Sequence, residues 1–220
     1  MDESQTFLSC GFLDPNAELR IRRRNLPHWQ QDDVWCFVTW RLADSVPAAV
    51  WKEWEEERAI WLRHHPLPWD DPTEDAYHER FSRRMDEWLD QGVGSCLLRE
   101  SANAMIVAAA VRHFDGDRYN LSCFVVMPNH VHVLFRPMGS HRIEAILKSW
   151  KGFTARKINE RMDRRGALWQ EEFWDRLVRS EWHFERYRTY IRQNPVKAKL
   201  RAKEFLWFEK ESPVHGLENP

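Results

Sequence analysis

Two strand-like runs separated by only two residues set the fold that this chain can adopt. Residues Tyr119–Met127 and His130–Arg136 are rich in β-branched and aromatic side chains, and Pro128-Asn129 joins them. So short a connection links neighbouring antiparallel strands, because parallel strands need a crossover of a dozen or more residues. We therefore expect an antiparallel sheet built around this hairpin.

The remaining sequence supplies a further strand and several helices. Val34–Leu42 has the composition of a buried strand, and apolar spacing predicts helices over about 45–62, 73–90, 101–113, 141–162 and 182–193, with short extended pieces at 168–169 and 173–178. Ser45 is a candidate cap for the first helix, and the last helix is expected to end before Pro195, since proline disfavours helix in the residue before it. This order predicts an α+β fold: a ferredoxin-like antiparallel sheet with packed helices and a helical insertion at residues 44–100.

Length and composition limit the class of protein. A chain of 220 residues can form one domain with a full core, which we expect over residues 1–203, followed by a C-terminal tail at 204–220. No apolar run is long enough to span a bilayer, no signal peptide is evident, and 30% of residues are charged, so no membrane association is expected. Cys10, Cys36, Cys96 and Cys123 show no CxxC spacing, which favours a reduced, cytoplasmic protein.

The charge is unevenly distributed along the chain. The formal total of −1 argues against a nucleic-acid-binding protein, but residues 136–203 hold 18 Lys and Arg against 8 Asp and Glu, a net charge of +10. Such a stretch is a candidate polyanion-binding surface, although its side chains could also simply solvate helix faces. The candidate DNA contacts are Lys148, Lys151, Arg156 and Lys157, together with an N-terminal arm containing Arg22, Arg23 and Arg24. We expect the acidic half, including the insertion, to lie away from the DNA-binding face.

The second run of the hairpin begins with a pair of histidines. On a strand, residues i and i+2 point to the same side, so His130 and His132 project together while Val131 and Val133 enter the core. Two adjacent imidazoles provide half of a divalent-metal site. The alternative is a pair of polar side chains that face solvent.

A second group of candidate residues lies on the last predicted helix. Tyr190 and Asn194 are four residues apart and share a helix face, so the Asn194 amide oxygen could add a third metal ligand beside the tyrosine hydroxyl. A tyrosine on an amphipathic helix also commonly packs in the core with its hydroxyl at the rim. Tyr187 lies on the same face, so spacing alone does not choose between the two tyrosines.

Together, the two groups resemble the motifs of a known family. The sequence MPNHVH at 127–132, followed by YIRQNPVKAKL at 190–200, resembles the single-tyrosine HUH transposases, specifically the REP-associated tyrosine transposases of bacteria. The segments RRNLPHW (23–29), FVTWRLADSVP (37–47), KSWKGFTARKIN (148–159) and LWQEEFWDRLVR (168–179) extend the resemblance over about residues 20–203. Lys199 departs from it, because glycine is expected there, and the 44–100 stretch is longer than in the minimal transposases.

The resemblance implies a reaction and a role for each matched residue. Tyr190 is expected to be the nucleophile, and His130, His132 and Asn194 are expected to hold Mg²⁺ or Mn²⁺, with no small-molecule cofactor. The implied substrate is single-stranded DNA folded into a REP-type hairpin, cleaved through a 5′-phosphotyrosine with release of a 3′-hydroxyl. A domesticated hairpin-DNA-binding protein and a hydrolytic phosphodiesterase are the alternatives. If the tyrosine helix packs on the sheet of a second copy, the protein must be a homodimer; if it packs on its own sheet, one chain suffices.

Overall fold

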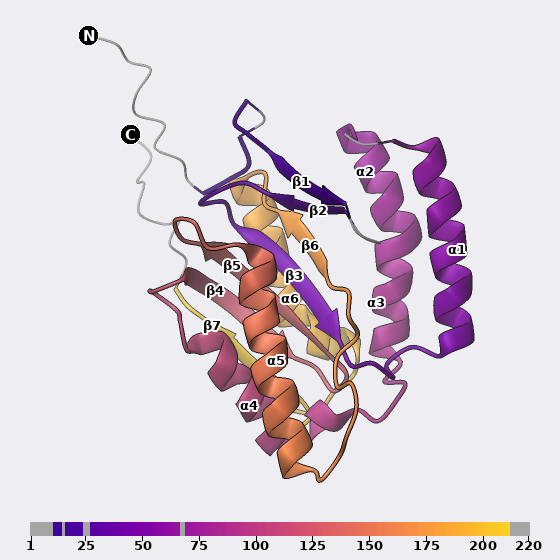
Figure 1. The fold of residues 1–220 in the computed structure, drawn as a ribbon, viewed down its shortest axis with the longest axis vertical. Helices are drawn as coiled ribbons and strands as arrows, with labels where there is room; N and C mark the ends of the chain where they lie inside the picture. Colours follow the sequence, from indigo (N-terminus) through magenta and orange to yellow (C-terminus); the bar gives the residue numbers. More distant parts are fainter. Residues whose placement is uncertain (1–10, 15, 24–26, 67–68, 212–220) are drawn as a thin grey trace.

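The computed structural model describes residues 11–14, 16–23, 27–66 and 69–211. One antiparallel sheet has the strand order β6-β3-β5-β4-β7 (Figure 1). Its strands are β3 (Cys36–Arg41), β4 (Tyr119–Val126), β5 (His130–Pro137), β6 (Trp174–Leu177) and β7 (Leu206–Glu209). The strands β1 (Arg20–Arg23) and β2 (Pro27–Gln30) pair separately.

The order of elements confirms the predicted fold class. Between β3 and β6, the sheet strands alternate with α4 (Ser101–Arg112) and α5 (Ile143–Arg161) in the sequence β-α-β-β-α-β. With the fourth of these strands beside the first and the third beside the second, this is the ferredoxin-like arrangement. The helices α4 and α5 cover one face of the sheet, and α6 (Glu181–Lys197) covers the other (Figure 1).

Strand β5 lies in the middle of the sheet and separates two cores. Val131, Val133 and Phe135 belong to the larger core beneath α4 and α5, whereas Leu134 belongs to the core beneath α6. Because side chains alternate along a strand, His130 and His132 share the α6 side with Leu134. This confirms the predicted direction of the histidine pair.

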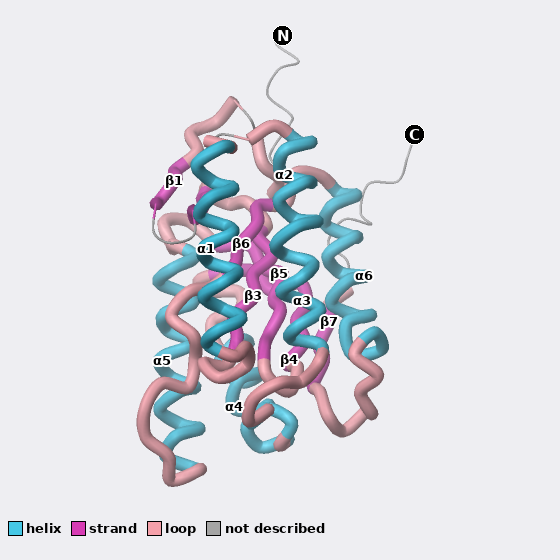
Figure 2. The backbone as a smooth tube through the Cα atoms, turned by 90° about the vertical axis from the view of Figure 1, so that its right-hand side faces the viewer, coloured by secondary structure: helices cyan, strands magenta, loops and turns pink. Residues whose placement is uncertain are grey.

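The expected helical insertion is present between β3 and α4. It contains α1 (Ala48–His64) and a continuous helical segment of α2 (Asp71–Tyr77), the π-helical turn η2 (His78–Ser82) and α3 (Arg83–Asp90), and it is followed by the 3₁₀ turn η3 (Leu97–Arg99). These helices stand beside the β6 edge of the sheet and next to α6 (Figure 2). Trp54, Phe81, Met85 and Leu89 form a buried core of their own between α1 and α3.

Aromatic contacts and a buried arginine attach the insertion to the sheet. Trp51 and Trp54 of α1 each pack edge-on against Trp174 of β6, with ring centroids 6.3 Å apart. The guanidinium of Arg41, at the end of β3, lies 4.3 Å from the Trp51 ring centroid. The insertion is therefore packed against the sheet through its tryptophans.

Two helix ends differ from prediction. Ser45 does not cap α1, which starts after Pro47; its hydroxyl instead donates to the Leu42 carbonyl at 2.8 Å. Helix α6 continues through Pro195 to Lys197. Proline removes one N–H from the helix, but the following turn is closed by bonds from Ala198 N to Asn194 O and from Leu200 N to Pro195 O. Asn194 consequently lies inside the helix.

The sheet continues past residue 203. Strand β7 pairs with β4 from Leu206 opposite Val126 to Glu209 opposite Cys123, so part of the segment expected as a tail forms an edge of the sheet. Cys36, Cys96 and Cys123 are free thiols, and Cys10 lies outside the described residues. Within the described residues, no helix is both long and apolar enough to cross a membrane.

Candidate active site

The four predicted site residues meet within one chain. His130 and His132 of β5 have ring centroids 4.6 Å apart, and the Tyr190 ring of α6 lies edge-on to His132 at 5.2 Å. The Asn194 amide nitrogen is 3.4 Å from His132 Nε2. Helix α6 thus sets both of its site residues against the sheet of its own chain.

Asn129, in the turn before β5, fixes the orientation of His130. Its Nδ2 donates to the carbonyls of Leu89 at 3.1 Å and Val93 at 3.2 Å, which leaves Oδ1 as the acceptor that faces His130 Nδ1 at 2.7 Å. The proton of His130 therefore lies on Nδ1, and Nε2 keeps its lone pair. A turn residue of the MPN motif thereby determines which nitrogen of the first histidine can act as a ligand.

Thr39 plays the same part for His132. It lies directly opposite His132 in the β3–β5 register, and its hydroxyl is 2.7 Å from His132 Nδ1. Since His132 Nε2 faces the Asn194 amide nitrogen, Nδ1 is the protonated nitrogen and donates to Thr39. Both histidines thus present Nε2 lone pairs on the α6 side.

The electrostatics of the site suit a cation. Burial lowers the pKa of His130 to about 3, and burial and the neighbouring His130 lower the pKa of His132 well below its ordinary value. Both imidazoles are therefore neutral, the form that binds metal. The Asn194 Oδ1 atom is buried and accepts no hydrogen bond from the part of the chain that the structure describes.

These donors fit a divalent ion. A buried amide oxygen with no partner carries a free-energy cost that a metal ligand bond would remove. Across the described ranges, no three His, Cys, Asp or Glu side chains gather in a way that could hold a metal, so a metal bound to His130 and His132 would take an amide as its third protein ligand. His130, His132 and Asn194 are the residues that would hold it.

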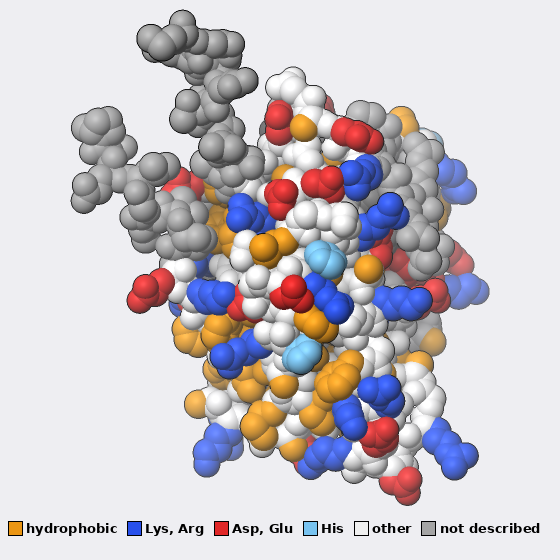
Figure 3. All heavy atoms as spheres, turned by 60° about the vertical axis from the view of Figure 1, so that its left-hand side comes forward, with side chains coloured by type: hydrophobic (Ala, Val, Ile, Leu, Met, Phe, Trp, Pro, Cys, Tyr) orange, Lys and Arg blue, Asp and Glu red, His pale blue; other side chains and the backbone are white. Residues whose placement is uncertain are grey.

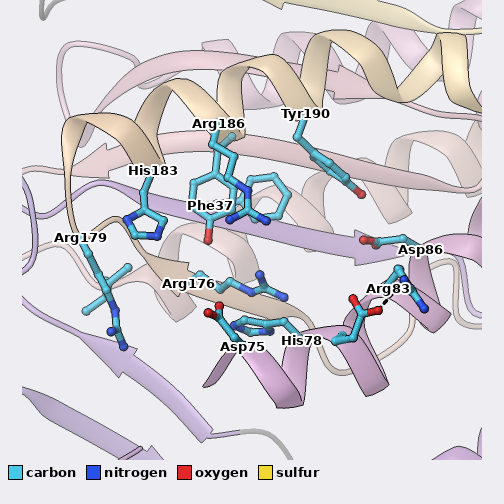
Figure 4. A pocket seen from close by; sticks show the side chains of 13 residues that line it. Phe37, Asp75, His78, Arg83, Asp86, Arg176, Arg179, His183, Arg186 and Tyr190 are labelled. Carbon is cyan, nitrogen blue, oxygen red and sulfur yellow. Dashed lines mark ion pairs between the residues drawn. The ribbon is translucent and has the colours of Figure 1, made fainter. Parts of the chain in front are cut away.

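Tyr190 is distinguished from Tyr187 by its surroundings. Tyr190 packs against His132, whereas Tyr187 stacks on Phe37 with ring centroids 4.7 Å apart. The Tyr190 hydroxyl is buried and, among the described residues, has no partner in regular hydrogen-bond geometry. The carboxyl group of Asp86 points at it from α3 (Figure 4). Burial raises the pKa of Tyr190 well above its ordinary value, and Asp86 adds to this effect.

A cavity of about 610 Å³ opens beside Tyr190, between the insertion and the sheet. The sheet side supplies mainly basic groups and the insertion supplies both signs of charge (Figure 4). Its charged and histidine side chains are Arg176, Arg179, His183 and Arg186 from β6, α6 and the loop between them, and Asp75, His78, Glu79, Arg83 and Asp86 from the insertion. Part of the acidic insertion, which we expected to lie away from the DNA-binding face, thus lines the cavity beside Tyr190.

The DNA-binding residues predicted on α5 lie on the other face of the sheet from this cavity. Lys148, Arg156 and Lys157 are exposed, but the Lys151 ammonium donates to the carbonyls of Gln170 at 2.8 Å and Glu171 at 2.6 Å. Lys151 is thus committed to holding the segment before β6. On the face shown in Figure 3, Lys and Arg side chains are interspersed with acidic and apolar ones and do not form one patch.

The N-terminal arm is only partly described. Arg22 and Arg23 belong to β1, whose backbone pairs with β2, and the positions of their side chains are not described. Arg24 lies outside the described residues. Asp86 is a site residue that the sequence patterns do not indicate, whereas Arg176, Arg179 and Arg186 belong to the basic residues of 176–203 that were expected to contact phosphates. The signal for these arginines was their place in the +10 segment.

A tyrosine and an amide on one helix, set over two neutral histidines of a central strand, define a candidate metal-assisted tyrosine nucleophile site. Residues 102–194 match the family model for IS200-like transposases. The matched segment contains His130, His132, Tyr190 and Asn194, whereas the insertion lies before it.

A REP-associated tyrosine transposase bound to a REP hairpin is 15% identical, with a TM-score of 0.40 over 74% of this chain and 67% of the other. A protein of Deinococcus radiodurans R1 assigned as a transposase is 17% identical, with a TM-score of 0.34 over 73% and 90% of the two chains. No curated protein matches the sequence. The similarity to transposases used below is the match over residues 102–194.

Proposed function

We propose that this protein is a single-stranded DNA endonuclease and strand transferase that cleaves hairpin DNA of the REP type through a 5′-phosphotyrosine intermediate. The observation that carries the proposal is the meeting of Tyr190 and Asn194 with His130 and His132 inside one chain. The match to IS200-like transposases supports the same class of activity. The REP-type hairpin is inferred from the resemblance of MPNHVH and YIRQNPVKAKL.

The residues of the site divide the work between binding and chemistry. Thr39 and Asn129 hold the two imidazoles so that their Nε2 atoms, with the Asn194 amide, can bind Mg²⁺ or Mn²⁺. Such an ion, when bound, polarises the scissile phosphate and stabilises charge on its oxygens. Tyr190 attacks phosphorus, the phosphorus–3′-oxygen bond breaks, and the phosphate becomes linked to the tyrosine. The bond is exchanged and not hydrolysed, so the reverse attack by a 3′-hydroxyl rejoins the strand.

The DNA is expected to use surfaces on both sides of the sheet. The arginines of the cavity are closest to Tyr190 and would contact the phosphates near the cleavage position, while Lys148, Arg156 and Lys157 on α5 would contact a more distant part of the hairpin. A homodimer is not needed to complete the site, because α6 packs on its own sheet. We expect the protein to act in the cytoplasm, where its DNA substrate lies.

The test is a covalent-adduct assay. A 3′-labelled library of single-stranded DNA hairpins with randomised flanks is incubated with the full chain and Mn²⁺, and a denaturing gel separates free from protein-linked DNA. The wild type should form a labelled adduct, and Tyr190→Phe should form none while still retarding the hairpins in a native gel. Tyr187→Phe is the matched control, because it removes a tyrosine hydroxyl from the same helix about one turn away from Tyr190.

Three other outcomes would each indicate a different nucleophile or a different function. An adduct that persists in Tyr190→Phe would show that another residue is the nucleophile. Hairpin retardation without any cleavage in Mg²⁺ or Mn²⁺ would favour a DNA-binding protein that has no transfer activity. Free 5′-phosphate ends without protein-linked DNA would identify a hydrolytic phosphodiesterase.

A further inference from the structure

We propose that Asp86, on helix α3 of the insertion, is the general base that takes the proton of the Tyr190 hydroxyl as the phosphotyrosine forms. This inference rests on the proposed function, since it names a further catalytic residue of the same site. Asp86 lies before residue 102 and so outside the segment that matches the IS200-like family. A base at Asp86 would give the insertion a chemical role, which the sequence alone does not indicate.

The geometry of the hydroxyl supports this role. The Tyr190 ring is held between His132 and Phe37, with centroids 5.2 and 5.7 Å from it, and its hydroxyl is directed across the cavity toward α3 (Figure 4). No described side chain or backbone group receives that hydroxyl in regular hydrogen-bond geometry, and the Asp86 carboxyl is the group that faces it. A general base must be within reach of the proton that it abstracts, and the contact commonly tightens only when substrate is bound.

The groups that face Asp86 keep it competent as a base. Burial raises its pKa to about 6; the Tyr190 hydroxyl, Arg176 of β6 and Lys197 of α6 oppose the rise, and Asp90, one turn along α3, adds to it. At neutral pH the group is therefore mainly a carboxylate that can accept a proton. A base whose pKa is near the working pH is favoured for proton transfer.

Asp86 is also held firmly in place. One residue earlier, Met85 is buried in the core of the insertion, and three residues later the Leu89 carbonyl accepts a hydrogen bond from Asn129. Asn129 is the residue that orients His130. The same amide therefore connects the helix of the base to the strand of the histidines, which ties the two parts of the site into one unit.

The proposed step moves one proton to Asp86 and exchanges one phosphorus–oxygen bond for another. The Tyr190 O–H proton passes to the Asp86 carboxylate while the tyrosine oxygen bonds to phosphorus, and the departing 3′-oxygen takes a proton from water. In strand joining, a 3′-hydroxyl gives its proton to solvent and attacks the phosphotyrosine, the phosphorus–tyrosine oxygen bond breaks, and Asp86 returns its proton to the tyrosine oxygen. By microscopic reversibility, the same carboxyl group acts in both directions.

The experiment compares Asp86→Asn, Asp86→Glu and Asp90→Asn in the full chain. Asp90 is the matched control: it lies one turn from Asp86 on α3 and burial also raises its pKa to about 6, but it acts on the Tyr190 hydroxyl through its charge alone, without a hydrogen bond. Single-turnover rates of adduct formation and of rejoining are measured on the hairpin library with saturating Mn²⁺, between about pH 5 and about pH 8. Thermal unfolding and native-gel retardation report whether each variant folds and binds DNA.

We expect Asp86→Asn to slow adduct formation and rejoining equally, by roughly 100-fold, so that the final ratio of adduct to free DNA is unchanged. The wild-type rate should fall with decreasing pH near pH 6, and Asp86→Asn should lose this dependence. Asp86→Glu should recover part of the rate, because it restores a carboxylate, and Asp90→Asn should stay within about threefold of the wild type.

Two results would overturn the inference. One is an Asp86→Asn rate within about threefold of the wild type in both directions. The other is a lower rate explained entirely by lost folding, lost hairpin binding or weaker Mn²⁺ binding measured by calorimetry. Failure of the proposed function is a separate result: the wild type would then form no adduct that depends on Tyr190.

Discussion

Replacing Asn129 by alanine should weaken both the fold and the metal site, because one buried amide serves both. The change removes three hydrogen bonds, to Leu89 O, Val93 O and His130 Nδ1. At about 1 kcal/mol each, they contribute about 3 kcal/mol to the free energy of unfolding. For a chain of this size that corresponds to a fall in Tm of roughly 6–12 °C. Loss of the group that orients His130 should weaken Mn²⁺ binding by roughly 10–100-fold.

Thermal unfolding measured by circular dichroism and Mn²⁺ titration by calorimetry test the two effects. Asn120→Ala is the control, since Asn120 of β4 makes no side-chain hydrogen bond with the described residues and should change the stability by less than about 0.5 kcal/mol. Asn129→Asp separates the two roles: its carboxylate still accepts from His130 Nδ1 but has no proton to donate to the two carbonyls. It should lose stability and keep most of the Mn²⁺ affinity. The reasoning is refuted if Asn129→Ala behaves like Asn120→Ala in both measurements.

Three further predictions follow from particular residues. Lys199 has a φ of 54°, a left-handed conformation that favours glycine, so Lys199→Gly should raise the free energy of unfolding by about 1 kcal/mol in urea denaturation. His130 has a pKa of about 3 in the folded protein against 6.5 for an unperturbed histidine, so below about pH 6.5 the unfolded chain binds more protons than the folded one. The free energy of unfolding should therefore fall as the pH drops from about 6.5 toward about 3, and it should fall less in His130→Gln. Replacing Lys148, Arg156 and Lys157 together by alanine should make the slope of log binding constant against log salt concentration smaller by roughly 2 for hairpin DNA. Lys151→Ala should instead mainly lower Tm, because the Lys151 ammonium donates hydrogen bonds to two backbone carbonyls.

Local patterns in the sequence were sufficient to predict the central hairpin and the histidine pair. The two-residue connection forces antiparallel pairing, and the alternation of His130, Val131, His132 and Val133 follows from strand geometry alone. The shared face of Tyr190 and Asn194 was predictable in the same way, from helical spacing. The end of α6 was not, because the turn after Pro195 is closed by bonds from Ala198 and Leu200 that compensate for the missing N–H.

The parts of the site that depend on distant segments could not be predicted. Asp86 reaches Tyr190 because the insertion packs Trp51 and Trp54 against Trp174 at the sheet edge. The helical spacing of these tryptophans indicates packing onto the rest of the domain, but it identifies neither the partner strand nor the place of Asp86. Similarly, Lys151 looks like any other basic residue of α5 in the sequence, yet it is used to hold the chain before β6. Its pKa is lowered to about 8 by burial, so it contributes less positive charge than a free lysine.

The distribution of charge has a different meaning in the folded protein than along the chain. The +10 segment is divided between the two faces of the sheet, with α5 on one and β6 and α6 on the other. Around the cavity, carboxylates of the acidic insertion stand opposite the arginines that DNA phosphates would contact. A phosphate that entered there would meet the carboxylates of Asp75, Glu79 and Asp86 as well as the arginines, and these carboxylates would repel it. Repulsion by these carboxylates would weaken the binding of any polyanion that makes no other contact with the protein. DNA that also bound on α5 or at the metal position would gain enough binding energy there to offset the repulsion. If the proposed function holds, we expect the acidic insertion to contribute selectivity as well as the carboxylate that faces Tyr190.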